Sequence, residues 1–192
     1  MDPVTVSKNS AYYGNNEGSA DGDTNFPQMI KEACQQVDGK VNFADYDSDG
    51  DGYVDLVYVI YAGYSESIVG NSGDCLWPKS GTVGVGTYDG KTVSRFGINN
   101  ELNNKPADTQ DGKYYINGIG LFCHEFSHTL GLPDIYPTNE ITEHNQSPEY
   151  WDVMDTGNYQ ADGYQPIPYS PWEKSIVGWK QPTLLSDTEA KQ

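Results

Sequence analysis

Two histidines four positions apart, His124 and His128, are the residues of this chain whose types and spacing best suit metal chemistry. On a helix this spacing places both imidazoles on one face, one turn apart, so that both can reach a single ion. Glu125 directly follows the first histidine. A carboxylate in that position can take a proton from a metal-bound water and pass it to a leaving amine. The pattern therefore predicts the minimal apparatus for hydrolysing a peptide bond.

The residues after His128 predict the end of the helix and a third ligand. Gly131 is suited to the left-handed residue that terminates a helix. Pro133 turns the chain away from the helix axis, because it donates no backbone hydrogen bond and keeps the preceding residue extended. Asp134 can then fold back. We predict a zinc ion held by the two histidines and Asp134, with water in the fourth position polarised by Glu125. The alternative is an ordinary amphipathic helix with a polar outer face.

Alternating aspartates between residues 45 and 55 resemble the opening of a calcium loop, in which carboxylates converge on one hard cation. Gly52 permits the sharp turn of such a loop. The predicted calcium ligands are Asp47, Asp49, Asp51, the carbonyl of Tyr53, and Asp55. Tyr58 replaces the bidentate glutamate of an EF-hand, so the segment is not an EF-hand. A solvated acidic turn is the alternative, although so many like charges repel strongly without a cation.

Composition limits the partners of this 192-residue chain, which has the length of one domain. Its 11 basic and 28 acidic residues give a net charge of -17, which argues against nucleic acid or an anionic membrane surface as a partner. No apolar run is long enough to span a membrane. We expect a monomer that acts on proteins or peptides.

The cellular compartment of the protein cannot be predicted from its N-terminal segment or from its cysteines. The segment after Met1 has no basic region followed by an apolar one, so the chain is either cytosolic or part of a longer secreted precursor, and we favour the second. The three cysteines are an odd number. Cys34 and Cys75 could pair, whereas Cys123 is expected to be a small buried filler beside the zinc motif.

The pattern of apolar residues predicts an α+β fold. We expect a first helix from Thr24 or Asn25 to about Val37, a central strand over 53–62, and weaker strands near 83–88 and 91–98. The glycine-rich stretch 81–86 is expected at a sheet edge or turn, where it could pair with an extended peptide. The zinc helix is expected from residue 117 or 118 to Gly131, and a short helix near 171–178.

The chain resembles the immune inhibitor A type of secreted bacterial metallopeptidases, within the metzincin group. The resemblance is carried by the motifs Tyr12-Tyr13-Gly14, the aspartate-rich loop into Val54-Asp55, Tyr61-Ala62-Gly63, Leu76-Trp77-Pro78, residues 124–134 and residues 174–179. It implies a twisted mixed sheet, an active-site helix and a smaller irregular C-terminal lobe. It also implies that Met154 forms the Met-turn below the zinc. Members of the family resemble longer precursors, so this chain looks like a catalytic core.

One departure from the metzincin pattern is Asp134, where a third histidine is more common. A carboxylate there lowers the net charge of the metal site and hence its acidifying effect on bound water. The fallback ligands are Glu140, Glu143 and Glu149.

We predict a secreted zinc endopeptidase in which residues 1–192 form one catalytic domain, with an upper part of about 1–131 and a lower part of about 132–192. Tyr159, five residues after Met154, is the candidate donor to the developing oxyanion. Two alternatives remain at this point. One is a calcium-stabilised binding module with a vestigial zinc site, and the other is a zinc amidase acting on a non-peptide substrate.

Overall fold

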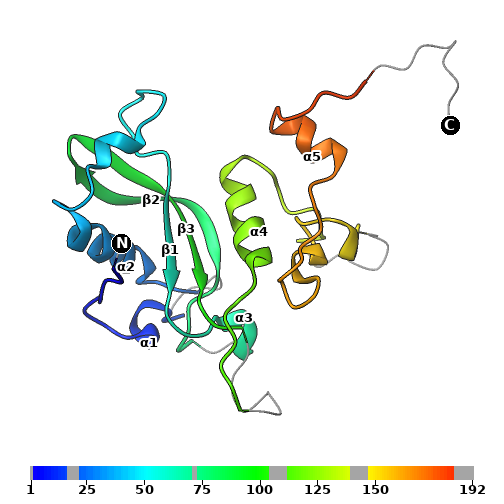
Figure 1. Cartoon of the computed structure of the whole chain (residues 1–192). Helices are drawn as coiled ribbons and strands as arrows, with labels where there is room; N and C mark the ends of the chain where they lie inside the picture. Colours follow the sequence, from blue (N-terminus) through cyan, green and yellow to red (C-terminus); the bar gives the residue numbers. More distant parts are fainter. Residues whose placement is uncertain (1, 17–21, 71–72, 104–111, 139–146, 184–192) are drawn as a thin grey trace, which may run out of the picture.

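A three-stranded mixed sheet forms the centre of the fold (Figure 1). A computed structural model of the chain describes residues 2–16, 22–70, 73–103, 112–138 and 147–183. The strands are β1 (Val57–Tyr61), β2 (Lys79–Tyr88) and β3 (Lys91–Asn100), in the order β1-β3-β2. β3 pairs parallel with β1 and antiparallel with β2. Asp89 and Gly90, both at positive φ, connect β2 and β3 in a tight hairpin.

Helices lie on both faces of this sheet. α2 (Phe26–Val37) packs on one face, and α4 (Ile119–Thr129) lies on the other, between the sheet and the C-terminal segment (Figure 1). The remaining elements are short. They are α1 (Ser10–Tyr13), η1 (Phe43–Tyr46), α3 (Glu66–Val69), η3 (Glu149–Trp151), η4 (Thr156–Tyr159) and α5 (Pro171–Ile176). No helix in the described ranges has the length and apolar character needed to cross a membrane.

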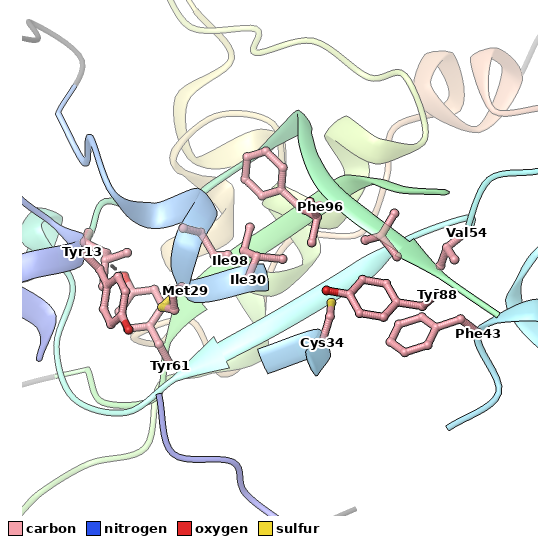
Figure 2. Packing of buried hydrophobic residues seen from close by; sticks show 13 residues of the cluster. Tyr13, Met29, Ile30, Cys34, Phe43, Val54, Tyr61, Tyr88, Phe96 and Ile98 are labelled. Carbon is pink, nitrogen blue, oxygen red and sulfur yellow. Dashed lines mark hydrogen bonds between the residues drawn. The ribbon is translucent and has the colours of Figure 1, made fainter. Parts of the chain in front are cut away.

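The main core lies between α2 and the sheet (Figure 2). Ile30 of α2 is completely buried, and so is Ile98 of β3. The rings of Phe43 and Tyr88 stack with centroids 4.9 Å apart at the far end of this core. Burying apolar side chains of this size contributes about 1.5–3 kcal/mol each. The expected amphipathic helix near 25–37 is therefore confirmed, and its apolar stripe faces the sheet.

The expectation of a central strand over 53–62 is wrong in both length and position. The strand is confined to β1, which lies at an edge of the sheet and pairs with β3 alone among the described residues. Ile60 is 63% exposed. The β-branched and aromatic run suggested burial on both faces, but α4 covers chiefly β2 and β3. Two strands near 83–88 and 91–98 are confirmed as β2 and β3, and the glycine-rich stretch lies in β2, the other edge strand.

A second, smaller core lies on the side of α4 that faces away from the sheet. Met154 is completely buried there with Leu132 and Val153, and Cys123 packs against the same cluster. The short C-terminal helix is confirmed as α5, which begins with a capping box between Ser170 and Glu173.

The structure contains no disulfide between the possible partners Cys34 and Cys75. Cys34, Cys75 and Cys123 all carry thiol groups that are not in a disulfide. Burial raises the pKa of the Cys34 thiol to about 11, so this thiol stays protonated and unreactive at neutral pH.

Candidate metal centre

Glycines let α4 approach the C-terminal segment closely enough to place its histidines. A Cβ atom on Gly120 would lie 1.8 Å from the carbonyl oxygen of Asn158 in η4. The backbone N–H of Gly120 donates to the carbonyl of Gly163 at 2.9 Å, which satisfies a donor in the first turn. At the other end the helix stops as expected, because Gly131 adopts a φ of 91°. The ends of α4 are therefore fixed against the chain that follows it.

Two imidazoles and one carboxylate converge beside this helix. The Nε2 atom of His124 lies 3.1 Å from Oδ1 of Asp134, and the Nε2 atom of His128 lies 3.3 Å from the same oxygen. The ligand atoms of the three residues all lie within 4.8 Å of one another. The chain turns back after Pro133, so that Asp134 faces the helix it has just left. The three residues that the sequence predicts as metal ligands thus lie close together in the fold.

Backbone carbonyls fix which nitrogen of each histidine faces the centre. Nδ1 of His124 is 2.9 Å from the carbonyl oxygen of Val153, and Nδ1 of His128 is 2.8 Å from that of Leu132. Because a carbonyl can only accept, each Nδ1 carries the hydrogen, and in the neutral imidazole Nε2 presents its lone pair. Asp134 Oδ1 is buried and accepts no well-aligned hydrogen bond. Three electron-rich atoms around one point fit a divalent cation, and two nitrogens with one oxygen form a donor set that zinc accepts.

The pKa values of the three groups reflect the same convergence. Burial acts to raise the pKa of Asp134, but its close contacts with the two histidines hold that pKa well below its usual range. Contact with Asp134 is the main cause of the raised pKa of His128. For His124, burial acts to lower the pKa, but Asp134 and the Val153 carbonyl together raise it. The arrangement of these groups thus favours positive charge next to the Asp134 carboxylate.

We expect zinc to stabilise the protein more at alkaline than at acidic pH. The raised histidine pKa values mean that the histidine–aspartate pairing stabilises the metal-free fold below about pH 6.5 and is lost as pH rises through the raised values. Asp134, with its lowered pKa, loses its contribution only as pH falls below its ordinary value of 3.8. Zinc requires both Nε2 atoms unprotonated, so its binding has the opposite pH dependence.

Thermal melting with and without a chelator measures this effect. The gain in Tm from zinc should be larger at about pH 8 than at about pH 5.5. An equal gain at both values would contradict binding through the two imidazoles.

Glu125 lies next to this group and is 7% exposed. Burial raises the pKa of its carboxyl group, while the neighbouring histidines oppose that shift. The buried Ser80 hydroxyl of β2 also faces this carboxylate and lowers its pKa, although the contact is not a well-aligned hydrogen bond. A carboxylate with a raised pKa can accept a proton at neutral pH more readily than an exposed one.

Cavities open on both sides of the candidate centre. The first has a volume of about 370 Å³ and contains His124 and Glu125 in its wall. The second has a volume of about 540 Å³ and contains His128 and Asp134 in its wall. Because His124 lies close to His128 and Asp134, the candidate metal group lies between the two cavities, which we together call the cleft.

The other predicted residues occupy different places. Tyr159 is 51% exposed and lines the first cavity, whereas Met154 is fully buried and donates its backbone N–H to Asp152. Glu149 is exposed and lies outside the His–His–Asp group. Of the other fallback ligands, Glu140 and Glu143 lie outside the residues that the structure describes.

The predicted calcium loop brings three of its five residues together. The carboxylates of Asp47, Asp49 and Asp51 lie within 4.8 Å of one another. The Asp47 side chain is 1% exposed, and its Oδ2 pairs with Lys91 at 2.6 Å while its buried Oδ1 has no hydrogen-bond partner. Asp55 is not part of this group, and its carboxylate accepts from the backbone N–H and hydroxyl of Ser48 in the same loop. The backbone N–H of Tyr53 donates to the carboxylate of Asp51.

The groups that orient and surround the candidate ligands were not predicted from the sequence. The carbonyls of Leu132 and Val153 have no side-chain signature, so no sequence signal could identify them. Ser80 comes from a distant strand and is equally hidden. Tyr136 had a weak signal, since it stands two residues after Asp134. Burial is the main cause of its raised pKa, followed by the charge of Asp134.

The fold and the site together define a metallopeptidase domain: a mixed sheet, a helix carrying two histidines and a glutamate, and a carboxylate that returns to them. The chain belongs to the immune inhibitor A peptidase M6 family, whose catalytic domain matches residues 1–182. Family membership implies a metal, and the His–His–Asp group is where the described residues can hold one.

Two named relatives agree with this assignment. The pre-pro-metalloprotease PrtV of Vibrio cholerae serotype O1 (strain M66-2) is 29% identical over 195 residues, covering 90% of this chain and 21% of the relative. Immune inhibitor A of Bacillus thuringiensis subsp. alesti is 29% identical over 149 residues, covering 70% of this chain and 21% of the relative. The chain thus spans about a fifth of the length of the curated relatives it matches.

Proposed function

We propose that the chain is the catalytic domain of a secreted zinc-dependent endopeptidase. The observation that carries this proposal is the convergence of His124, His128 and Asp134 on one point, with Glu125 beside them in the wall of a cleft. Zinc, when bound by these three residues, would supply positive charge that acidifies water and polarises the scissile carbonyl.

Glu125 performs the proton transfers. Its carboxylate takes a proton from the attacking water and delivers it to the nitrogen of the departing amine. Burial suits it to this role, because a raised pKa brings the carboxyl group closer to the pH at which it must both accept and donate. The carbonyls of Leu132 and Val153 keep the histidine rings oriented by accepting from their Nδ1 atoms.

The substrate would lie along β2. This strand is at an edge of the sheet, and its residues Ser80, Gly81 and Thr82 line the second cavity. An extended peptide can add to such an edge through backbone hydrogen bonds, which places its scissile bond across the cleft. This arrangement supports a peptide over a non-peptide amide as the substrate.

Tyr159 is our candidate for the donor to the developing oxyanion, because it lines the first cavity with Glu125. Tyr136 lines the same cavity and is the natural comparison. The role predicts that Tyr159→Phe lowers kcat about 10²-fold with little change in KM, and that Tyr136→Phe lowers it less. A larger loss of kcat in Tyr136→Phe than in Tyr159→Phe, measured by steady-state kinetics, would assign the role to Tyr136 instead.

Metal analysis combined with a peptide-library digest tests the proposed function. The protein should contain one zinc per chain and cleave peptides, lose cleavage to a chelator, and recover it when zinc is restored. Zinc without cleavage of any peptide would favour a vestigial site in a binding module. Cleavage of non-peptide amides alone would favour the amidase.

We propose a calcium ion in the aspartate-rich loop, held by Asp47, Asp49 and Asp51. The buried and unpartnered Oδ1 of Asp47 supports this proposal, since an orphaned buried carboxylate oxygen costs free energy that a cation would recover. Calcium at a hundredfold excess over its Kd should raise the Tm by several degrees, because binding then adds about 2.7 kcal/mol of stability. The double substitution Asp49→Asn and Asp51→Asn should remove the shift, and an equal shift with magnesium would contradict a calcium site.

The remaining proposals concern organisation. We propose that residues 1–192 are one catalytic domain with the cleft between an upper part of about 1–131 and a lower part of about 132–192. The ligands support this division, because two come from α4 and the third from the chain beyond it. The name of the Vibrio relative describes a precursor, which supports export of this chain from a longer precursor as well. Detection of the protein in culture medium and size-exclusion chromatography test export and the monomeric state.

A further inference from the structure

Arg95 of β3 is the sole arginine in a chain of net charge -17. It is exposed and lines the cavity beyond His128, together with Thr82 and Asp134. Neither a hydrogen bond nor an ion pair engages its guanidinium within the part of the chain that the structure describes. In a protein with so many carboxylates, an arginine without a carboxylate partner is notable because opposite charges are abundant around it.

The sheet geometry directs Arg95 toward the cleft. Phe96 and Ile98 point into the core beneath α2 (Figure 2), so the alternating residue Arg95 projects from the opposite face, where α4 lies. Its direct partner in the neighbouring strand is Thr82. α4 ends at Thr129, and this residue lines the same cavity as Arg95, together with His128 and Asp134 of the candidate metal group.

The chemistry of this half of the cleft favours a carboxylate. Asp134 is the only acidic side chain among the described residues that line the cavity, and the metal proposal already engages it. A guanidinium offers a planar fork of N–H donors that matches both oxygens of a carboxylate. Thr82 lies directly opposite Arg95 on the same face of the sheet. Side chains in such a pair are close enough for both to contact one ligand.

We propose that Arg95 selects substrates that place a carboxylate in the cavity beyond His128, so that the enzyme prefers an acidic residue there over a neutral or basic one. This inference rests on the proposed peptidase function, which it deepens by naming a substrate class. The carboxylate can come from an internal aspartate or glutamate, or from the C-terminus of a peptide. The negative net charge of the protein repels an acidic substrate as a whole, whereas Arg95 attracts a carboxylate at one position of that substrate.

Matched peptides test the proposal. One series has an amidated C-terminus and carries Glu, Gln or Lys at each position on either side of the scissile bond, and one neutral peptide has a free C-terminal carboxylate. In the wild type, kcat/KM should be about fivefold higher with Glu than with Gln at one position at low salt, and the ratio should fall toward one as salt is added. Preference for the free C-terminus alone would assign the carboxylate to the end of the substrate.

Charge reversal gives the sharpest result. Arg95→Gln should bring the Glu-to-Gln ratio to about one, and Arg95→Glu should make Lys the preferred residue at the same position. Lys40→Glu, which makes the same change in net charge at an exposed site after α2, should leave the wild-type ratio in place. Ratios that are the same in wild type and Arg95→Glu would overturn the proposal.

A binding assay separates this inference from the proposed function. Zinc-loaded Glu125→Gln protein and its Arg95→Glu derivative can be titrated with the same fluorescent peptides, and the ratio of Kd values needs no turnover. Absence of cleavage by the wild type would refute the peptidase function, while equal Kd ratios would refute the role of Arg95. A fall in Tm on Arg95→Gln with unchanged peptide ratios would show that the arginine serves the C-terminal end of α4 instead.

Discussion

Glu125→Gln should abolish peptide hydrolysis while leaving zinc bound. Glutamine has nearly the same size as glutamate, so the cleft and the histidine positions should persist, but its amide cannot accept the proton of the attacking water. General acid–base catalysis contributes about 10²–10⁴-fold, and we expect a loss near the upper end because Glu125 both accepts and donates the proton. Steady-state kinetics should show the loss in kcat, with zinc content per chain unchanged.

Glu101→Gln is the matched control, because it makes the same chemical change at an exposed glutamate outside both cavities. It should retain the wild-type kcat. Residual activity of Glu125→Gln within about tenfold of wild type would remove Glu125 from its assigned role. Loss of zinc from the variant would instead show that Glu125 supports the metal site.

Gly120→Ala should destabilise the protein strongly. Alanine is a better helix former than glycine by about 1 kcal/mol, so propensity alone predicts a gain in stability. The packing predicts the opposite, because the new Cβ would lie 1.8 Å from the carbonyl oxygen of Asn158. That oxygen belongs to the backbone of η4 and cannot rotate away. Overpacking of this kind costs about 1–3 kcal/mol or more, so we expect a net loss of about 2 kcal/mol or more.

Chemical denaturation of wild type and variant measures this loss as a lower midpoint at an unchanged m-value. Gly84→Ala is the control, since a Cβ there meets nothing within 4 Å. The clash should also move α4 relative to η4, so Gly120→Ala should bind zinc more weakly than Gly84→Ala. A Gly120→Ala protein of wild-type stability would mean that α4 and η4 are not in close contact.

The candidate metal group could be predicted from the sequence because the features that define it are local. His124 and His128 share a helical face through spacing alone, and Gly131 and Pro133 predict the turn that returns Asp134. These features need no contact with distant parts of the chain. The amphipathic helix near 25–37 and the hairpin strands were predictable for the same reason, since their periodicity reflects which side is buried.

The order of the strands could not be predicted in this way. The run 53–62 has the composition of a buried central strand, yet β1 lies at the edge and exposes Ile60. Strand order depends on which segments pair over long separations, and hydrophobic composition carries little information about pairing partners. The carbonyls of Leu132 and Val153 were unpredictable for a related reason, since every residue has a carbonyl and only folding selects the ones that meet a histidine.

Local spacing along the chain was enough to identify the candidate metal ligands, the position of Glu125 next to them, and the acidic loop at 47–51. Three further features depend on folding: Ser80 faces Glu125, the Val153 carbonyl orients His124, and Arg95 lines the cavity beyond His128. The physical reason is the range of the interactions: helix periodicity and turn geometry act over a few residues, whereas these contacts join a strand, a helix and a turn that are distant in the chain and meet only when the core packs.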